Sequence, residues 1–128
     1  MTVADVYDRA LGLMYATSAD KPDYNDFIIP VVNVLLGELF VTNNAILLAK
    51  EEEPLTSIPY VTAVGDTLTY EDEVLVSIIP YGIAGILLGE DPSTANLSIQ
   101  YKNKYEEQKL MAKCGYYTDI TDNYEDEE

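Results

Sequence analysis

Residues 74–88 constrain the fold most, because this apolar, glycine-bearing segment is followed at once by a Gly-Glu-Asp-Pro break. Its apolar residues recur every three or four positions, which is the spacing of a helix with one face turned inward. Other apolar residues widen that face, so we predict a central helix that is buried on most sides. The expected inward positions are Leu75, Ile78, Ile79, Gly82, Ile83, Ile86 and Leu87.

Gly82 and Gly85 lack bulk within this predicted helix. Small residues let a neighbouring backbone come close, either inside one chain or across a contact between subunits. Ordinary packing within the core is the simpler interpretation. We therefore predict that both glycines are helix-packing positions.

A second helix is predicted to start at the break, with Asp91 as its N-cap and Pro92 at its first position, where a missing N–H costs nothing. Leu97, Tyr101 and Tyr105 form a stripe that is expected to pack against the other helices. Gly115 is expected to end the helix, because glycine adopts a left-handed C-terminal conformation cheaply.

The amino-terminal half predicts two more helices. The first is capped by Thr2 with Asp5 and is expected to end near Thr17. The second is capped by Asp23 and contains Pro30, which predicts a kink or a late start. Its inward side chains are expected to be Tyr24, Phe27, Ile28, Val31, Val34, Leu35 and Leu39.

Residues 50–70 contain two prolines and a glycine that break any helix, together with two short segments of extended character. This pattern predicts either a long projecting loop or a short hairpin packed on the helices. Residues 115–128 carry six acidic and no basic side chains. Such a segment is expected to be solvated, although its aromatic residues give it the means to dock on a partner. The predicted partner contacts are Tyr60, Tyr70, Tyr116, Tyr117 and Tyr124.

Together these patterns predict an all-α fold. Residues 1–114 would form a domain like a four-helix bundle, with the long loop or hairpin between its second and third helices, and residues 115–128 an acidic carboxyl-terminal arm. A chain of 128 residues that is 48% hydrophobic can bury a single core. The apolar run of residues 74–88 falls short of the ~20 residues that span a bilayer. We expect a soluble, unexported protein with no membrane contact.

The sequence shows no pattern for catalysis. It contains no histidine, and its single cysteine, Cys114, cannot form an internal disulfide or a zinc site. No phosphate-binding glycine loop follows a strand, and no calcium loop is complete. We therefore predict no catalytic residue, no metal ion and no cofactor.

The formal net charge of −16 argues against binding free nucleic acid, because affinity for phosphate comes mostly from lysine and arginine. The charge is compatible with a surface that DNA must pass without adhering, since repulsion acts within roughly 8 Å at physiological salt. Solubility alone is the other explanation of this charge.

The order of elements resembles the head-to-tail connector proteins of tailed bacteriophages, also called adaptor or head-completion proteins. The resemblance is strongest over residues 70–109, where an acidic helix start, a Pro-Tyr-Gly-Ile-Ala centre, a Gly-Glu-Asp-Pro break and an Asn-to-Tyr-Glu helix follow one another. It extends more loosely over residues 3–48. The chain departs from that family in its strongly acidic end.

This resemblance implies a non-enzymatic structural subunit that assembles with copies of itself, as twelve, into a ring. The ring would bridge the portal protein and a tail, stopper or tail-completion protein. It would line a channel through which double-stranded DNA passes without specific binding. The implied location is the head-tail junction of the virion, after assembly in the host cytoplasm. By the same analogy, residues 115–128 and residues 51–70 would contact the portal or the tail.

Two other functions remain open from the sequence. An acidic DNA-mimic inhibitor of a DNA-binding enzyme would be a monomer or dimer with carboxylates in regular rows. A small helical enzyme or regulatory subunit would contain a concave pocket with convergent polar groups. The mass of the assembled species distinguishes the connector from the mimic, and a ligand bound in a pocket would indicate the third class.

Overall fold

The computed structural model describes the backbone of residues 1–14 and 21–126 and the side chains of residues 1–14 and 24–113. These residues form six α-helices, one short 3₁₀ helix and no strand, which confirms the all-α fold class. The helices are α1 (Val3–Leu13), α2 (Lys21–Glu38), α3 (Phe40–Ala49), α4 (Asp72–Ser77), α5 (Ile79–Leu88), η2 (Pro92–Thr94) and α6 (Ala95–Asp126).

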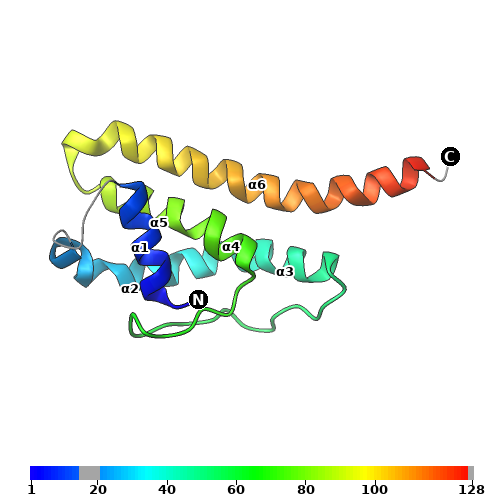
Figure 1. Ribbon diagram of the computed structural model, residues 1–128, viewed down its shortest axis with the longest axis horizontal. Helices are drawn as coiled ribbons and strands as arrows, with labels where there is room; N and C mark the ends of the chain where they lie inside the picture. Colours follow the sequence, from blue (N-terminus) through cyan, green and yellow to red (C-terminus); the bar gives the residue numbers. More distant parts are fainter. Residues whose placement is uncertain (15–20, 127–128) are drawn as a thin grey trace.

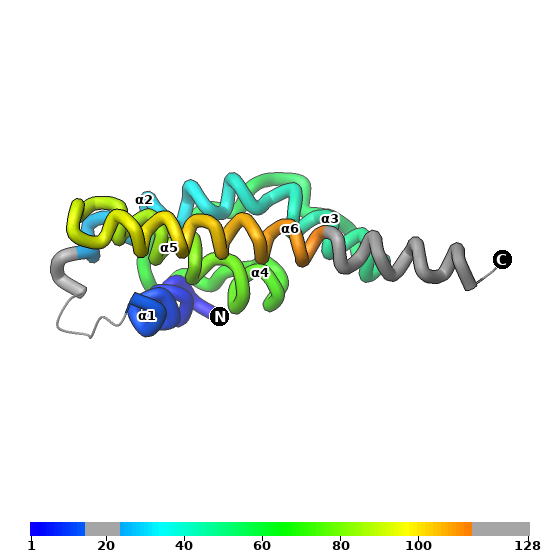
Figure 2. Tube along the Cα trace, turned by 90° about the horizontal axis from the view of Figure 1, so that it is seen from above, coloured from blue at the N-terminus to red at the C-terminus, as the bar shows by residue number. Residues whose placement is uncertain are grey.

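Helix α5 occupies the centre of the molecule and contacts α1, α2, α4 and α6. Figure 1 shows α6 along one side of the other helices, and the long loop between α3 and α4 along the opposite side. In the view of Figure 2, α1 and α2 lie on opposite sides of α5. The predicted central position of the glycine-bearing helix is therefore confirmed.

Helix α1 begins as its sequence predicts. The backbone N–H of Asp5 donates to the Thr2 hydroxyl (3.3 Å), and the Asp5 carboxylate accepts from the Thr2 backbone N–H (2.8 Å). This reciprocal capping box satisfies donors that have no partner inside the helix. The helix ends at Leu13, earlier than predicted, and Thr17 lies outside the described residues.

The predicted second helix is divided into α2 and α3 at Leu39, where Tyr24–Glu38 and Phe40–Ala49 are bent by 51°. Helix α2 continues through Pro30, which is exposed, so the carbonyl that loses its helical donor faces water. Asp23 lies inside the helix and does not cap it. No single helix in the described ranges is long and apolar enough to cross a membrane; this bent pair reaches that length and composition only jointly.

The apolar segment before the break is also divided. Helices α4 and α5 meet at Ile78, and Pro80 stands in the first turn of α5, where its missing N–H is tolerated. Asp91 caps a helix at the predicted break, but that helix is the short η2, and α6 itself begins at Ala95; the Asp91 carboxylate accepts from the backbone N–H of Ser93 (2.9 Å). The predicted second helix and the predicted central helix are therefore each divided into two shorter helices.

Gly82 and Gly85 bring α5 close to its neighbours. A Cβ atom on Gly82 would lie 2.8 Å from the Leu35 side chain of α2 and 3.1 Å from the Tyr105 ring of α6. On Gly85 it would lie 2.8 Å from Cγ and 3.2 Å from the backbone nitrogen of Lys102. Ser98 reinforces the contact by donating from Oγ to the Gly85 carbonyl at 2.6 Å. The close approach predicted for these glycines occurs within the chain.

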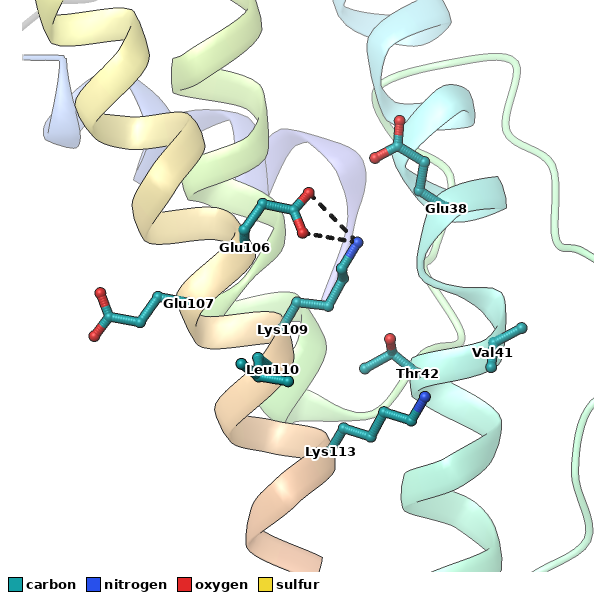
Figure 3. Close-up of a pocket in the computed structure, with 8 residues that line it drawn as sticks. All are labelled: Glu38, Val41, Thr42, Glu106, Glu107, Lys109, Leu110 and Lys113. Carbon is teal, nitrogen blue, oxygen red and sulfur yellow. Dashed lines mark hydrogen bonds and ion pairs between the residues drawn. The ribbon is translucent and has the colours of Figure 1, made fainter.

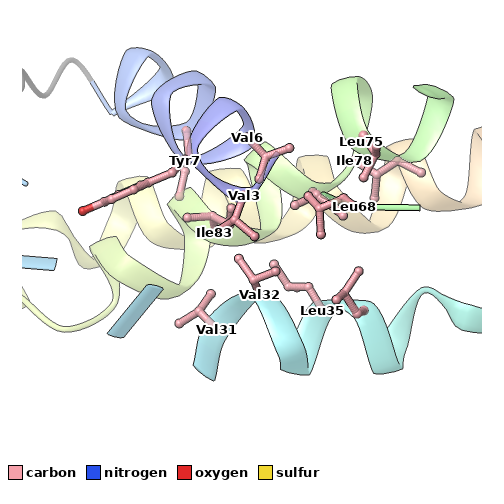
Figure 4. Close-up of a cluster of buried hydrophobic side chains, with 14 of the residues drawn as sticks. Val3, Val6, Tyr7, Val31, Val32, Leu35, Leu68, Leu75, Ile78 and Ile83 are labelled. Atoms are coloured by element: carbon pink, nitrogen blue, oxygen red, sulfur yellow. The ribbon is translucent and has the colours of Figure 1, made fainter. Parts of the chain in front are cut away.

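The core gathers side chains from α1, α2, α4, α5 and the long loop, as Figure 4 shows. Each fully buried aliphatic side chain contributes about 1.5–3 kcal/mol by leaving water. Leu97 and Tyr101 pack on this core while Tyr105 is buried in it. The side chains that Figure 4 labels are Val3, Val6, Tyr7, Val31, Val32, Leu35, Leu68, Leu75, Ile78 and Ile83.

Two further expectations are corrected. Phe27 and Val34 do not turn inward; they are about half exposed, at 50% and 54%. Gly115 does not end α6, whose bounds are Ala95–Asp126. A helical glycine costs only about 1 kcal/mol relative to alanine, so one glycine does not oblige a helix to stop.

Candidate partner interface

Asparagine side chains from the helices fix the path of the loop between α3 and α4. The Asn33 side chain donates to the Val61 carbonyl and accepts from the Val61 N–H, both at 2.9 Å. Asn44 makes the same pair of bonds with Leu55, at 3.1 and 2.9 Å.

Backbone polar groups need hydrogen-bond partners when they leave water, and a strand obtains them from a neighbouring strand. Here two amide side chains supply the partners instead. Residues 50–70 contain no strand, and their one β-bridge is the isolated pair of Thr2 and Thr67. The alternative of a short hairpin is therefore wrong, and the segment is a loop with an imposed path.

The far end of the loop is attached to the amino terminus of the chain. The backbone N–H groups of Val3 and Ala4 donate to the carbonyls of Asp66 (3.0 Å) and Val64 (2.8 Å). The Asp66 carboxylate folds the turn by accepting from the backbone of Thr62 (2.7 Å) and Ala63 (3.1 Å). These hydrogen bonds lower the pKa of Asp66.

The two predicted contact residues of this loop have opposite environments. Tyr60 is 76% exposed, and its neighbour Ile58 is 53% exposed. Tyr70 is only 3% exposed and donates its hydroxyl to the Leu36 carbonyl; burial raises the pKa of Tyr70 to about 12. The prediction that Tyr70 contacts a partner is therefore corrected, because its side chain belongs to the core.

An exposed apolar stripe runs along α2 and α3. Its four residues recur at every seventh position, and each has between 50% and 66% of its surface exposed. Positions seven apart lie on one side of a helix, as in the seam of a coiled coil. The stripe consists of Phe27, Val34, Val41 and Leu48.

The loop between α3 and α4 lies beside this stripe and adds two exposed apolar side chains to it. The bonds from Asn33 and Asn44 hold the loop against α2 and α3, with Ile58 and Tyr60 between the two attachment points. Large apolar side chains grouped on one side mark contact surfaces more often than isolated ones do. We call this group the α2–α3 surface; it consists of Phe27, Val34, Val41, Leu48, Ile58 and Tyr60.

A second exposed group lies on α6. Ile99 and Leu110, 56% and 61% exposed, stand eleven residues apart, which is about three turns and places them on one side of the helix. Four lysines share residues 95–113 with two glutamates. We call Ile99, Leu110 and Lys102 the α6 face; Lys109 and Lys113 line the cleft toward α3, and Lys104 pairs with Glu107 at 3.9 Å.

An open cleft separates α3 from the middle of α6 (Figure 3). Lys109 forms an ion pair with Glu106 at 3.2 Å on its α6 side, and Tyr105 donates to Glu38 of α2 at 2.9 Å. Burial is the main cause of the raised pKa of Tyr105, and the hydrogen bond to Glu38 adds to it. Both phenols, Tyr70 and Tyr105, are therefore neutral hydrogen-bond donors at physiological pH.

The cleft brings together no pair of groups poised for acid-base chemistry. Its lysine and glutamate side chains are exposed enough for water to screen them, and each such ion pair contributes only about 0–1 kcal/mol. Within the part of the chain that the structure describes, no cluster of acidic, histidine or cysteine residues is arranged to hold a metal ion.

The remaining predicted contacts, Tyr116, Tyr117 and Tyr124, lie outside the residues whose side chains are described. The α2–α3 surface was missed from the sequence, since its residues share an apolar pattern with the core of the same helices. Seven-residue spacing does not distinguish it either, because the buried residues Val32, Leu39 and Ile46 recur at the same interval. Comparison of the chain with protein-family models, curated proteins and solved structures gives no match.

Proposed function

We propose that the chain is a structural subunit of a ring in the head-to-tail connector of a tailed bacteriophage. The ring bridges the portal and the tail at the head-tail junction of the virion and lines the channel through which DNA leaves. The observation that carries the proposal is the α2–α3 surface, whose large apolar side chains stay exposed although the same helices complete a buried core.

A ring subunit must present two different surfaces that fit each other, because a contact between identical patches closes at a dimer. The α2–α3 surface and the α6 face are two such surfaces, built from different helices and of different charge. Both surfaces lie on regular helices or on a loop whose path is fixed by hydrogen bonds. Binding therefore orders few additional residues and loses little conformational entropy.

The net charge of −16 supports a role beside DNA. Carboxylates that face the channel repel phosphates and keep DNA from adhering during packaging and release. The repulsion acts over roughly 8 Å at physiological salt. The acidic residues 115–128 are the proposed arm toward the portal or the tail, with Tyr116, Tyr117 and Tyr124 as its apolar contacts.

Native mass spectrometry of the full chain, alone and mixed with the portal protein of the same genome, tests this function. We expect a complex in which several copies, twelve by the family resemblance, bind one portal ring. A chain that never binds the portal, and instead forms a small stable species that inhibits a DNA-binding enzyme, would favour the DNA mimic and refute the connector.

Matched substitutions show whether the α2–α3 surface takes part in the assembly. Val41→Ser and Tyr60→Ser remove exposed apolar contacts from the surface and are expected to reduce the assembled fraction. Val64→Ser is the control, since Val64 is 45% exposed on the same loop but lies outside the surface. Equal assembly by all three variants would show that the surface is not the contact.

A further inference from the structure

The α2–α3 surface has an acidic rim. Asp26 and Glu38 are exposed beside the stripe on α2, and residues 51–53, all glutamate, are exposed where α3 ends. Lys50 at that end already pairs with Glu73 (2.8 Å) and Glu71 (3.4 Å) at the start of α4, and Lys109 and Lys113 of α6 line the cleft beside Glu38. The surface therefore combines an apolar centre with a border in which acidic side chains predominate.

This border disfavours a contact between two α2–α3 surfaces. A two-fold contact would place the glutamates and aspartates of one copy against those of the other, and juxtaposed like charges in an interface cost several kcal/mol. The cost adds to the general repulsion between subunits whose net charge is −16. A second copy must therefore present a different surface.

The α6 face has the complementary properties. Ile99 and Leu110 supply exposed apolar side chains, and the lysines of residues 95–113 outnumber the glutamates by four to two. Lys102 is exposed, with its Cγ atom lying over Gly85 so that the stem rests on α5. The close approach of α5 and α6 thus holds the aliphatic part of the Lys102 side chain in place, while the residue stays exposed.

The α6 face is long enough to cover part of the stripe. Ile99 and Leu110 are ~16 Å apart along α6, and the whole stripe from Phe27 to Leu48 would extend over ~31 Å if α2 and α3 formed one straight helix. Both are ridges on helices, which pack by placing the side chains of one between those of the other.

We infer that the α2–α3 surface of one copy binds the α6 face of a second copy, head to tail, with Lys102 of α6 facing the acidic rim. This inference rests on the proposed function for its biological setting and supplies the subunit contact of the proposed ring. Because the two surfaces differ, the pair formed by the first contact keeps one surface of each kind free. Further copies can add to these free surfaces until a closed ring leaves none of them free.

Disulfide trapping tests the contact without any portal protein. The natural Cys114 is replaced by serine, and single cysteines are placed at Val34 or at Ile99, both exposed. Under mild oxidation, mixing Val34→Cys with Ile99→Cys is expected to give about tenfold more disulfide dimer than either variant alone, because only the mixture places a cysteine on each side of the contact. Raising the salt concentration should reduce this excess, since salt screens the charges.

Ala63→Cys provides the background, because Ala63 is exposed on the loop outside both surfaces. Its yield with Val34→Cys measures random collision. A homodimer of Val34→Cys that equals the mixed product, or a mixed yield no higher than this background, would overturn the inference. Portal binding is measured separately, so a chain that fails to bind a portal but forms the mixed disulfide would refute the connector function and retain the contact.

Discussion

The Asn33 side chain pairs with both backbone groups of Val61, one as donor and one as acceptor, at 2.9 Å each. An amide side chain on a helix thus takes the place of an adjacent strand. This relationship, repeated between Asn44 and Leu55, gives the loop one path without any sheet.

Asn33→Ala is expected to destabilise the fold. The substitution leaves the N–H and carbonyl of Val61 without their partners, and an unsatisfied group that is shielded from water costs about 1–3 kcal/mol. The free energy of unfolding from urea titration measures the loss. Asn103→Ala is the control, because Asn103 is exposed on α6. Equal losses in the two variants would contradict the role given to Asn33.

Gly85→Ala and Gly37→Ala are expected to act in opposite directions. At Gly85 the added methyl group would lie 2.8 Å from Lys102 Cγ and 3.2 Å from its backbone nitrogen, so α6 must shift, at a typical cost of about 1–3 kcal/mol. At Gly37 nothing lies within 4 Å, and alanine should stabilise the helix by about 0.4–1 kcal/mol. Thermal unfolding of both variants checks the signs, and stabilisation at Gly85 would exclude a close contact there.

Tyr70→Phe and Tyr60→Phe separate the buried tyrosine from the exposed one. Loss of the Tyr70 hydroxyl leaves the Leu36 carbonyl without that donor and should cost about 1 kcal/mol. Loss of the Tyr60 hydroxyl should change the unfolding free energy by less than about 0.5 kcal/mol, as is usual for surface positions. Chemical denaturation of the two variants gives both values. A larger loss at Tyr60 would mean that its side chain is not free.

The Asp66 carboxylate should make stability depend on pH below about 4. Its pKa in the folded protein is lowered from the ordinary 3.8 by hydrogen bonds from the backbone of Thr62 and Ala63. A carboxyl group whose pKa is lowered by folding stabilises the fold fully when the pH is above its pKa in the unfolded chain. This contribution is lost as the pH falls through its pKa in the folded protein. The difference in melting temperature between the natural chain and Asp66→Ala should therefore be full at neutral pH and disappear in acid. A constant difference would contradict this linkage.

The capped starts of helices were predictable because their chemistry is local. Thr2 with Asp5, and Asp91 with Pro92, carry the side chains that satisfy the free N–H groups of a first turn, and both lie where the sequence places them. The inward face of α5 was equally clear, since its apolar side chains repeat with the helical period.

The bends at Leu39 and Ile78 could not be predicted, because no local signal marks Leu39 and Pro80 fits either a straight or a broken helix. The orientation of α2 also escaped prediction. Apolar residues surround most of this helix, so periodicity alone does not distinguish Leu35, which is 1% exposed, from Val34, which is 54% exposed. Asn33 and Asn44 carried no signal for contact with a loop distant in sequence.

The Asn33 and Asn44 amides hold the loop through its backbone and leave its outward side chains unused. The residues that set the conformation of the loop therefore differ from those that a partner would contact. Conformation is dictated by Asn33 and Asn44, whereas the character of the outward face is set by Ile58 and Tyr60. Substitutions at the outward positions can therefore alter partner preference without a penalty in folding. In the proposed connector, specificity for a partner would then evolve at these positions independently of stability.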